Sequence, residues 1–580
     1  MTQRIASPTT PWGLLPRRTW SLLTDLPVFA AGFAVFYSVV LLARYWASPF
    51  SPQVTISNRP AALPAYALYS LLRIIVAYFL SLIFTLAYGY VAAYNPKAER
   101  FMIPLLDILQ SIPVLSFLPG VMLAMVSMFP RHQLGIELGA ILLIFTGQVW
   151  NMTFSFYSSL KSIPTEMQEA ARVYRFSAWQ RFTQIELPYA ALGLIWNSMM
   201  SVAGGWFFLM ACEMFVLGSR DFRLPGLGSY LQTAASAGDT RAILWGLVAM
   251  VGIIVLLDQL VWRPVIAWAQ KFKVEQVESA EAPRSPVLML LRRSNALRLF
   301  NQRITRPLGE RTALHFARRS PRFSGSSAGA KVRMWTMRAI GVAAGIGIVV
   351  AVFDAIRLLG GLTRVDLRVL GVGAGATFLR VCCALTIAIA WTVPVGVKIG
   401  FNPRLARIAQ PLAQIAASVP ATALFPVVLL ALIRIGGGLG TGSIVLLLLG
   451  TQWYVLFNVI AGAMAIPTDL KEATQVFRFT QREKWRKLIL PGIFPYLVTG
   501  LVTAAGGAWN ASIVAEYFHL KGQTISTVGL GATISHATDS GNFALLLAAT
   551  ILMATIVVTV NRALWRPMYH LAETRFRLEA

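Results

Sequence analysis

Long apolar segments recur along this chain and alternate with short polar and basic ones. Each is about 20 residues long, enough for a helix to cross the roughly 30 Å hydrocarbon core of a bilayer. We expect helices because backbone polar groups in lipid need partners within their own segment. We therefore predict an all-α polytopic membrane protein with about twelve spans, at 28–47, 67–93, 104–129, 138–160, 190–216, 242–269, 335–359, 373–400, 410–435, 441–465, 493–518 and 543–568.

The second half of the chain repeats the first. Arg73 matches Arg380 at a step of 307, and Glu213 matches Glu516 at a step of 303, after a four-residue length difference near the third loop. Such agreement indicates a tandem duplication. With six spans in each half, both repeats cross the membrane in the same direction, about an axis along the membrane normal.

Domain boundaries follow from this repeat. We predict a first half at 1–270, a basic linker at 271–333 and a second half at 334–580. Within the linker, residues 287–300 mix Leu with Arg. They fit either an amphipathic helix on an anionic membrane surface or a flexible basic tether.

Composition and charge support this picture. The chain has 580 residues, of which 56% are hydrophobic and 13% charged, against about 25% charged in soluble domains. The net charge is +27, and the basic residues lie largely between the apolar segments. This distribution favours the positive-inside rule over nucleic-acid binding as the reason for the excess of basic residues. We expect both termini and the basic loops to be cytoplasmic, in a cell inner (plasma) membrane. Cys212, Cys382 and Cys383 show no metal-type spacing, so we expect no metal site.

A polar insert occurs once in each half, at 163–188 and at 466–491. We predict two short helices in each copy, with a return to the membrane at Pro188 and Pro491. Capping-box patterns mark the helix starts, at Thr165/Gln168, Ser177/Gln180 and Thr480/Glu483.

Apolar side chains stand at matching positions of the two inserts. They fit either a helix lying on lipid or a helix seated in a groove of a cytoplasmic partner. Glu169 and Glu472, among basic residues in both copies, favour the partner. The apolar positions are Val173, Tyr174, Phe176, Phe182 and Ile185, matched by Val476, Phe477, Phe479, Trp485 and Leu488.

The insert resembles the EAA loop of bacterial ABC importer permeases, since Glu-Ala-Ala is followed by Ile-x-Leu-Pro after basic and aromatic residues. With Ser-x-Pro, Gly/Trp and Gly-Leu-Gly motifs in both halves, the chain resembles a duplicated permease of the nitrate/taurine/bicarbonate branch. The resemblance implies a type I importer-like fold, in which this loop docks on a separate ATPase. The implied coupling residues are Glu169, Ala170, Ala171, Arg175 and Phe176, and Glu472, Ala473, Thr474, Arg478 and Phe479.

Both copies depart from that family at one position. Arg175 and Arg478 stand where the family usually has Gly. Gly readily takes the left-handed conformation that ends a helix, whereas another residue there costs about 1–2 kcal/mol. Because both copies depart identically, we expect a matching change in the ATPase groove, such as an acidic residue facing each Arg.

The chain has no nucleotide-binding motif of its own. A Walker A loop needs Gly-x-x-x-x-Gly-Lys-Ser/Thr, and the Gly-rich stretch 436–442 lacks the Lys. Energy must come from a partner or from an ion gradient. We assign no catalytic residue and expect no cofactor on this chain, with ATP and Mg bound by the partner ATPase.

Charged residues within the spans are candidates for a translocation path. Arg73 and Arg380 could attract an anion, or each could pair with Glu213 or Glu516 and fix helix packing. Trp206, Trp509, Asn197 and Asn510 could line a path or pack helices. We expect the third spans to be broken or kinked by prolines, at Pro113, Pro119, Pro420 and Pro426.

The resemblance implies the permease subunit of an ATP-driven importer of a small anion such as nitrate, a sulfonate or bicarbonate. Its expected partners are two cytoplasmic ATPase subunits and the lipid bilayer, with no nucleic acid. Whether a periplasmic substrate-binding protein is needed stays open. The alternatives are a secondary transporter with parallel six-plus-six repeats and a membrane scaffold without transport.

Overall fold

The computed structural model describes residues 55–575 apart from 131, 218–219, 273–284, 319–344, 348, 351, 435, 437 and 521–522, and also residues 25–27, 30 and 46. The predicted span 28–47 lies almost wholly outside these residues. The predicted span 335–359 is described in part, and its residues 352–359 are helical.

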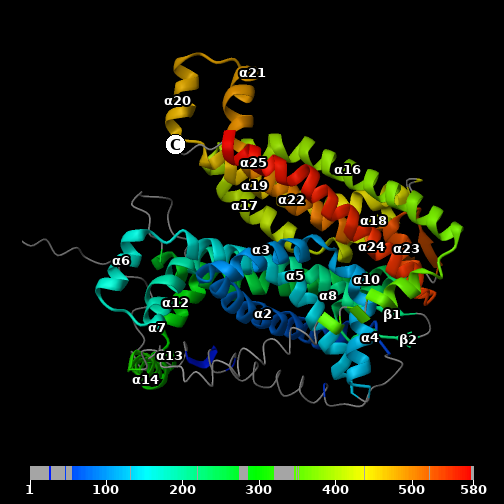
Figure 1. Cartoon of the computed structure of the whole chain (residues 1–580), viewed down its shortest axis with the longest axis horizontal. Coiled ribbons are helices and arrows are strands. Elements are labelled where there is room, and N and C mark those ends of the chain that lie inside the picture. Colours follow the sequence, from blue (N-terminus) through cyan, green and yellow to red (C-terminus); the bar gives the residue numbers. More distant parts are fainter. Residues whose placement is uncertain are drawn as a thin grey trace, which may run out of the picture. The chain divides into compact units, whose positions relative to one another are not determined.

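Long helices dominate both halves (Figure 1). Those of the first half are α2 (Leu63–Tyr94), α5 (Leu134–Lys161), α8 (Leu187–Glu213) and α10 (Thr240–Leu257); those of the second are α16 (Arg364–Gly400), α19 (Leu439–Ala465), α22 (Leu490–Ala515) and α24 (Phe543–Val560). In the described part of the chain, eight helical segments are long and apolar enough to cross a membrane, or ten with two bent pairs. The predicted all-α polytopic fold with two repeats is confirmed.

The third span of each half is broken, as its prolines predict. In the first half α3 (Pro96–Ser111), η2 (Val114–Phe117) and α4 (Leu118–Met128) form a pair bent by 84°. In the second half α17 (Pro403–Ser418) and α18 (Ala421–Arg434) are bent by 85°. Each break falls at the first proline of its pair, Pro113 or Pro420, because proline has no N–H to continue the helix and disfavours a helical residue before it.

Five π-helical turns have one common cause. Each ends two residues before a proline, which cannot donate a hydrogen bond and whose ring crowds the carbonyl four residues earlier. Widening the preceding turn accommodates the ring without ending the helix. The turns are η3 (Phe182–Glu186), η4 (Asp258–Trp262), η6 (Asn301–Thr305), η7 (Trp485–Ile489) and η8 (Asn561–Trp565), followed by Pro188, Pro264, Pro307, Pro491 and Pro567.

A short hairpin follows the fifth span of each half and was not predicted. Strand β1 (Val216–Leu217) pairs with β2 (Arg220–Asp221), and β3 (Tyr517–Leu520) pairs with β4 (Gln523–Ser526), both antiparallel. The predicted spans 190–216 and 493–518 therefore extend three residues beyond the ends of α8 and α22. The helices end earlier because the returning chain bonds their last carbonyls: Leu224 N donates to Glu213 O at 3.2 Å and Thr527 N to Glu516 O at 3.0 Å.

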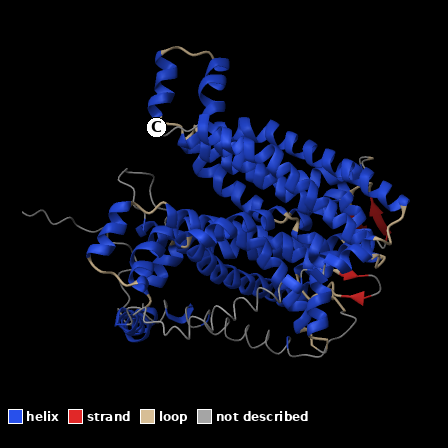
Figure 2. Cartoon of the chain, in the orientation of Figure 1, coloured by secondary structure: helices blue, strands red, loops and turns tan. Residues whose placement is uncertain are grey.

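After each hairpin the chain enters a short helix, α9 (Leu227–Ala237) or α23 (Leu530–Asp539). The last spans continue past π turns into α11 (Arg263–Ala269) and α25 (Arg566–Arg575). Figure 2 shows the strands together at one end of the long helices. The second insert projects from the opposite end of its unit, at the top of Figure 1.

Contacts between residues divide the chain into two compact units, and the boundaries of these units differ from those of the two sequence repeats. One unit holds residues 1–45, 158–196 and 256–329, and the other holds 46–157, 197–255 and 330–580. The first unit contains the first insert and the linker helices α12 (Pro286–Arg293), α13 (Asn295–Phe300) and α14 (Arg306–Arg318). The described part of the linker is thus helical, which favours the amphipathic-helix interpretation. The linear domain boundaries stay a prediction.

Candidate functional site

Each insert is a pair of short helices joined by a left-handed residue. In the first copy α6 (Thr165–Val173) and α7 (Ala178–Arg181) flank Arg175, whose φ is 51°. In the second, α20 (Thr468–Val476) and α21 (Gln481–Lys484) flank Arg478, whose φ is 50°. Among the described residues these two arginines are the non-glycine residues with positive φ. The left-handed turn is therefore kept without the usual Gly.

The turn is a Schellman cap in both copies. In the first insert Arg175 N donates to Arg172 O at 3.0 Å and Phe176 N to Ala171 O at 2.9 Å. In the second, Arg478 N and Phe479 N donate to the carbonyls of Gln475 and Thr474 at the same distances. The side chains of Ala171 and Thr474 are buried, so these two coupling candidates belong to the cap and not to the exposed surface.

The helix starts match the predicted caps in two of three cases. Complete capping boxes are present at Ser177/Gln180 and at Thr480/Glu483, which confirms those predictions. The predicted box at Thr165/Gln168 is wrong. Helix α6 begins at Thr165 with Pro164 at the cap position, and Gln168 Nε2 instead donates to Ile163 O at 3.0 Å.

The most exposed apolar side chains of the inserts lie at their tips. The exposed fractions are 77% for Val173 and 75% for Tyr174, and 77% for Val476 and 73% for Phe477. Glu169 and Glu472 are exposed as well. Adjacent large apolar side chains that are exposed together are typical of surfaces that contact a protein or a membrane. We call Val173 and Tyr174, with Val476 and Phe477, the insert tips.

The second insert is also fixed to the end of α16. The ammonium groups of Lys471 and Lys484 lie 4.8 and 5.6 Å from the centre of the Phe401 ring, within range of a cation–π interaction. Burial and the neighbouring Lys484 lower the pKa of Lys471. The tip of this insert therefore extends from a segment that has its own tertiary contacts, at Lys471 and Lys484.

Replacing Arg175 or Arg478 with Gly is expected to stabilise the local turn by about 1 kcal/mol, because Gly takes the left-handed conformation without the Cβ clash. Hydrogen exchange of the backbone amide of Phe176 or Phe479 measures this, with slower exchange expected. Arg172→Gly removes the same charge from within α6 and should instead speed exchange. Faster exchange in the two turn variants would contradict the strain argument.

A buried ionic cluster ties together the elements of the first half. Arg73 of α2 donates to Glu213 of α8 at 2.7 Å and to Glu137 of α5 at 2.6 Å, and all three side chains are fully buried. Ser70 Oγ and Gly228 N each donate to the Glu213 carboxylate at 2.7 Å. Every hydrogen-bonding group at this ion pair is therefore engaged by the protein itself.

The second half contains the twin of this cluster with one acid fewer. Arg380 donates to Glu516 at 2.8 Å, while Thr377 Oγ1 and Gly531 N donate to the same carboxylate at 2.8 and 2.9 Å. The position that corresponds to Glu137 is Gly440. The Arg380 side chain is 13% exposed, and its second amino group donates to Thr527 Oγ1 at 2.9 Å.

The Gly-Leu-Gly motif of each half surrounds this carboxylate. A Cβ on Gly226 would lie 2.2 Å from the carboxyl carbon of Glu213, and a Cβ on Gly529 would lie 2.1 Å from Glu516 Oε2. Only Gly leaves room for the acid. Sequence reasoning missed Glu137, as well as Ser70 and Thr377, although these last two stand three residues before the matched arginines.

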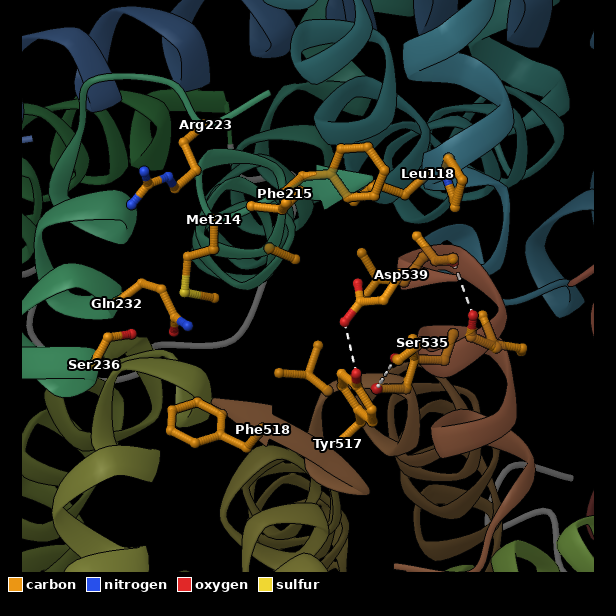
Figure 3. A pocket seen from close by; sticks show the side chains of 18 residues that line it. Leu118, Met214, Phe215, Arg223, Gln232, Ser236, Tyr517, Phe518, Ser535 and Asp539 are labelled. Carbon is orange, nitrogen blue, oxygen red and sulfur yellow. Dashed lines mark hydrogen bonds between the residues drawn. The ribbon is translucent and has the colours of Figure 1, made fainter. Parts of the chain in front are cut away.

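A cavity of about 360 Å³ lies between elements of the two repeats (Figure 3). The first repeat contributes the region of the Pro113 break, the end of α8 and α9, and the second contributes the end of α22, β3 and α23. The lining residues with polar side chains are Arg223, Gln232, Ser236, Tyr517, Ser535, Thr538 and Asp539.

The predicted path residues are not among those that line this cavity. Trp206 and Trp509 are buried, at 1% and 2% exposed, and Asn197 is half-buried. Asn510 lies beside the cavity, where its Oδ1 accepts a hydrogen bond from Leu115 N at 3.4 Å. A role for these residues in a path stays a proposal.

Comparison with known sequences assigns the family. The family described as the inner membrane component of binding-protein-dependent transport systems matches residues 85–261 and 388–565, more than half of the chain. The chain belongs to this family. It matches twice, once in each repeat, so the protein is a fused ABC importer permease and a multi-pass membrane protein. Each matched range contains one insert and one Gly-Leu-Gly motif.

Curated relatives place the permease in the predicted branch. It is 27% identical over 187 residues to the bicarbonate transport system permease protein CmpB of Synechococcus elongatus, covering 32% of this chain and 64% of the relative. It is 24% identical to the nitrate import permease protein NrtB of Synechocystis sp., covering 33% and 66%. It is 29% identical to the taurine transport system permease protein TauC of Escherichia coli, covering 32% and 61%. The chain thus spans about two thirds of the length of these relatives.

Proposed function

We propose that this permease forms the complete membrane path of an ATP-driven importer for a small anion. Cytoplasmic ATPase subunits dock on the two inserts, and both docking sites lie on one chain. ATP and Mg are bound by those subunits, since the permease has no Walker A loop. The proposed substrate class follows the names of the relatives, which are permeases for bicarbonate, nitrate and taurine.

The observation that carries this proposal is the matched pair of insert tips. Both copies keep the same left-handed cap and expose a β-branched and an aromatic side chain by about three quarters of their surface. A helical element with aromatic anchors at its tip fits a groove on a protein partner. Equal presentation in both repeats is expected if two similar ATPase subunits bind.

The inserts connect directly to the helices that reach the cavity. The second insert leads through η7 into α22, and the end of α22 supplies the lining residues Ile513 and Val514. The 26 residues of α22 span about 39 Å at 1.5 Å per residue. In the first repeat α8 likewise runs from its insert to the lining residue Ala211. We infer that nucleotide-driven movement of the inserts is transmitted along these helices to the cavity.

We propose that both inserts, the linker and both termini face the cytoplasm, where basic loops are favoured. The cavity and the hairpins would then lie toward the opposite side. A periplasmic substrate-binding protein, as the family description implies, would deliver substrate there.

Energy coupling separates this proposal from a secondary transporter. Right-side-out vesicles that contain the full system should lose uptake of the transported anion when ATP is depleted. They should retain most of it when a protonophore collapses the ion gradient while ATP is held constant. Loss of uptake with the protonophore alone would favour the secondary transporter instead.

Glu169→Ala with Glu472→Ala should lower the amount of ATPase that copurifies with the permease.

A further inference from the structure

The two inserts share one backbone geometry but carry different charges. The first insert contains three basic and three acidic side chains, whereas the second contains six basic and three acidic ones. The difference arises at corresponding positions of the two repeats. Arg482 stands in the second insert where the first has Trp179, and Arg486 stands where the first has a threonine. The two copies therefore present different surfaces to a partner.

The charges of the first insert balance one another. Arg181 forms an ion pair with the buried carboxylate of Glu186 at 2.6 Å. The remaining charged side chains are two arginines and two glutamates, all of them exposed, so the exposed surface carries no net charge. These four are Arg172, Arg175, Glu166 and Glu169. The exposed ring of Trp179 adds apolar surface to α7 of this insert.

Three of the six basic side chains in the second insert are held by neighbours in the same chain. Lys471 and Lys484 lie over the Phe401 ring, and Lys487 pairs with Glu483 at 3.3 Å. The other three are exposed arginines, and none of them has an ion-pair partner among the described residues. We call these three, Arg478, Arg482 and Arg486, the insert arginines.

The insert arginines lie next to the tip and along the helix that follows it. Arg478 comes directly after the tip residue Phe477, at the left-handed turn. Arg482 of α21 and Arg486 of η7 are four residues apart in one continuous helix, and side chains at this spacing are neighbours. Like charges at this spacing repel each other. Carboxylates on a partner would relieve that repulsion, and their geometry suits the planar guanidinium group.

The position of the insert arginines favours a protein partner over a lipid surface. Helices α20 and α21 project beyond the long helices of their unit, at the top of Figure 1. The arginines continue from the exposed Phe477 side chain, which is the proposed anchor in the ATPase groove. Charge and anchor therefore belong to one surface.

We propose that the second insert docks in an acidic groove of its ATPase subunit, where carboxylates face the insert arginines, and that the first insert docks mainly through apolar contacts. This inference rests on the proposed ATPase docking and specifies the chemistry of one of its two sites. Salt screens exposed charges, and charges at the edge of an interface govern its salt dependence. The two sites of one permease should therefore differ in their response to ionic strength.

The test measures each docking site by itself in the full-length permease. Tyr174→Asp leaves the second site intact, and Phe477→Asp leaves the first. The permease is held in nanodiscs of phosphatidylcholine, and the probe is the ATPase that copurifies with the wild-type permease. Raising KCl from about 50 mM to about 500 mM should weaken ATPase binding about tenfold at the second site, and about twofold or less at the first.

Two double variants, made in the permease that retains only the second site, locate the effect. Arg482→Gln with Arg486→Gln removes two of the insert arginines and should reduce the salt effect to about threefold or less. Arg364→Gln with Arg368→Gln removes the same charge from exposed positions at the start of α16, the end opposite Phe401. This matched control should leave the tenfold effect unchanged.

Equal salt dependence at the two sites would overturn the inference, and it is the result expected if the insert arginines contact lipid headgroups or water instead of the ATPase. A tenfold effect that Arg482→Gln with Arg486→Gln leaves intact would overturn it as well. Absence of ATPase binding at both sites at either salt concentration would appear differently, because it would overturn the proposed docking itself and this inference with it.

Discussion

Arg73→Gln is expected to destabilise the permease by about 3–5 kcal/mol, the usual cost of removing one partner from a buried ion pair. Glu137 and Glu213 lose the guanidinium that contacts both of them at 2.6 and 2.7 Å, and two buried carboxylates remain without their cation. The measurement is the midpoint of unfolding of the purified permease in a titration of micelles with a denaturing detergent.

Arg380→Gln provides the matched comparison within the same chain. Its guanidinium contacts one carboxylate and is partly exposed, so we expect a smaller loss, about half as large. If Arg73→Gln folds normally but abolishes uptake, the arginine serves the substrate and the packing account is wrong. Equal losses in the two variants would contradict the role given to Glu137.

Tyr174→Asp combined with Phe477→Asp is expected to reduce ATP-driven uptake by at least about 100-fold. Under the proposed docking, each change puts a carboxylate where an aromatic anchor would enter the partner groove, and hot-spot losses of about 2 kcal/mol or more at each site are typical of such anchors. The permease should still reach the membrane, since both side chains are about three-quarters exposed. The amount of copurified ATPase and the uptake rate measure the effect.

The duplication offers a conservative control for this experiment. Tyr174→Phe with Phe477→Tyr exchanges the aromatic residues of the two tips, and should retain both ATPase binding and uptake. Single Asp variants report whether the two docking sites contribute equally. Wild-type uptake in the double Asp variant would exclude the insert tips as the docking surface.

The sequence predicts the parts of this fold that depend on local pattern. The length of each apolar segment predicts a membrane-spanning helix. The constant difference in residue number between the two repeats identifies their corresponding positions. Proline places the breaks at Pro113 and Pro420, since the lost hydrogen bond is a property of the residue itself. The Arg–Glu pairs were one of two alternatives, because matched charges in a span fit either a path or a packing contact.

Features that depend on long-range contact were not predicted. Glu137 reaches Arg73 across 64 residues of sequence, and its partner in the other repeat is a glycine, so the repeat pattern gives no signal for it. The predicted capping box at Thr165 is wrong for a local reason instead. Pro164 already occupies the cap position, and the sequence pattern alone does not determine which of two neighbours begins the helix.

The cavity was not predicted, because its set of lining side chains is formed only where elements of the two repeats meet. Arg223 and Asp539 occupy unmatched positions, far apart in the sequence, and neither lies within a predicted span. The predicted path residues are charged, amide and tryptophan side chains within predicted spans, whereas the cavity lining comes from the ends of helices and the segments that follow them.

The central claim is that one chain presents two ATPase docking sites. Native mass spectrometry of the complex purified through a tag on the permease tests it most directly. The account predicts one permease chain with two ATPase subunits, falling to one subunit when either Tyr174→Asp or Phe477→Asp is introduced alone. A complex with a single ATPase in the wild type, or two permease chains per ATPase pair, would contradict it.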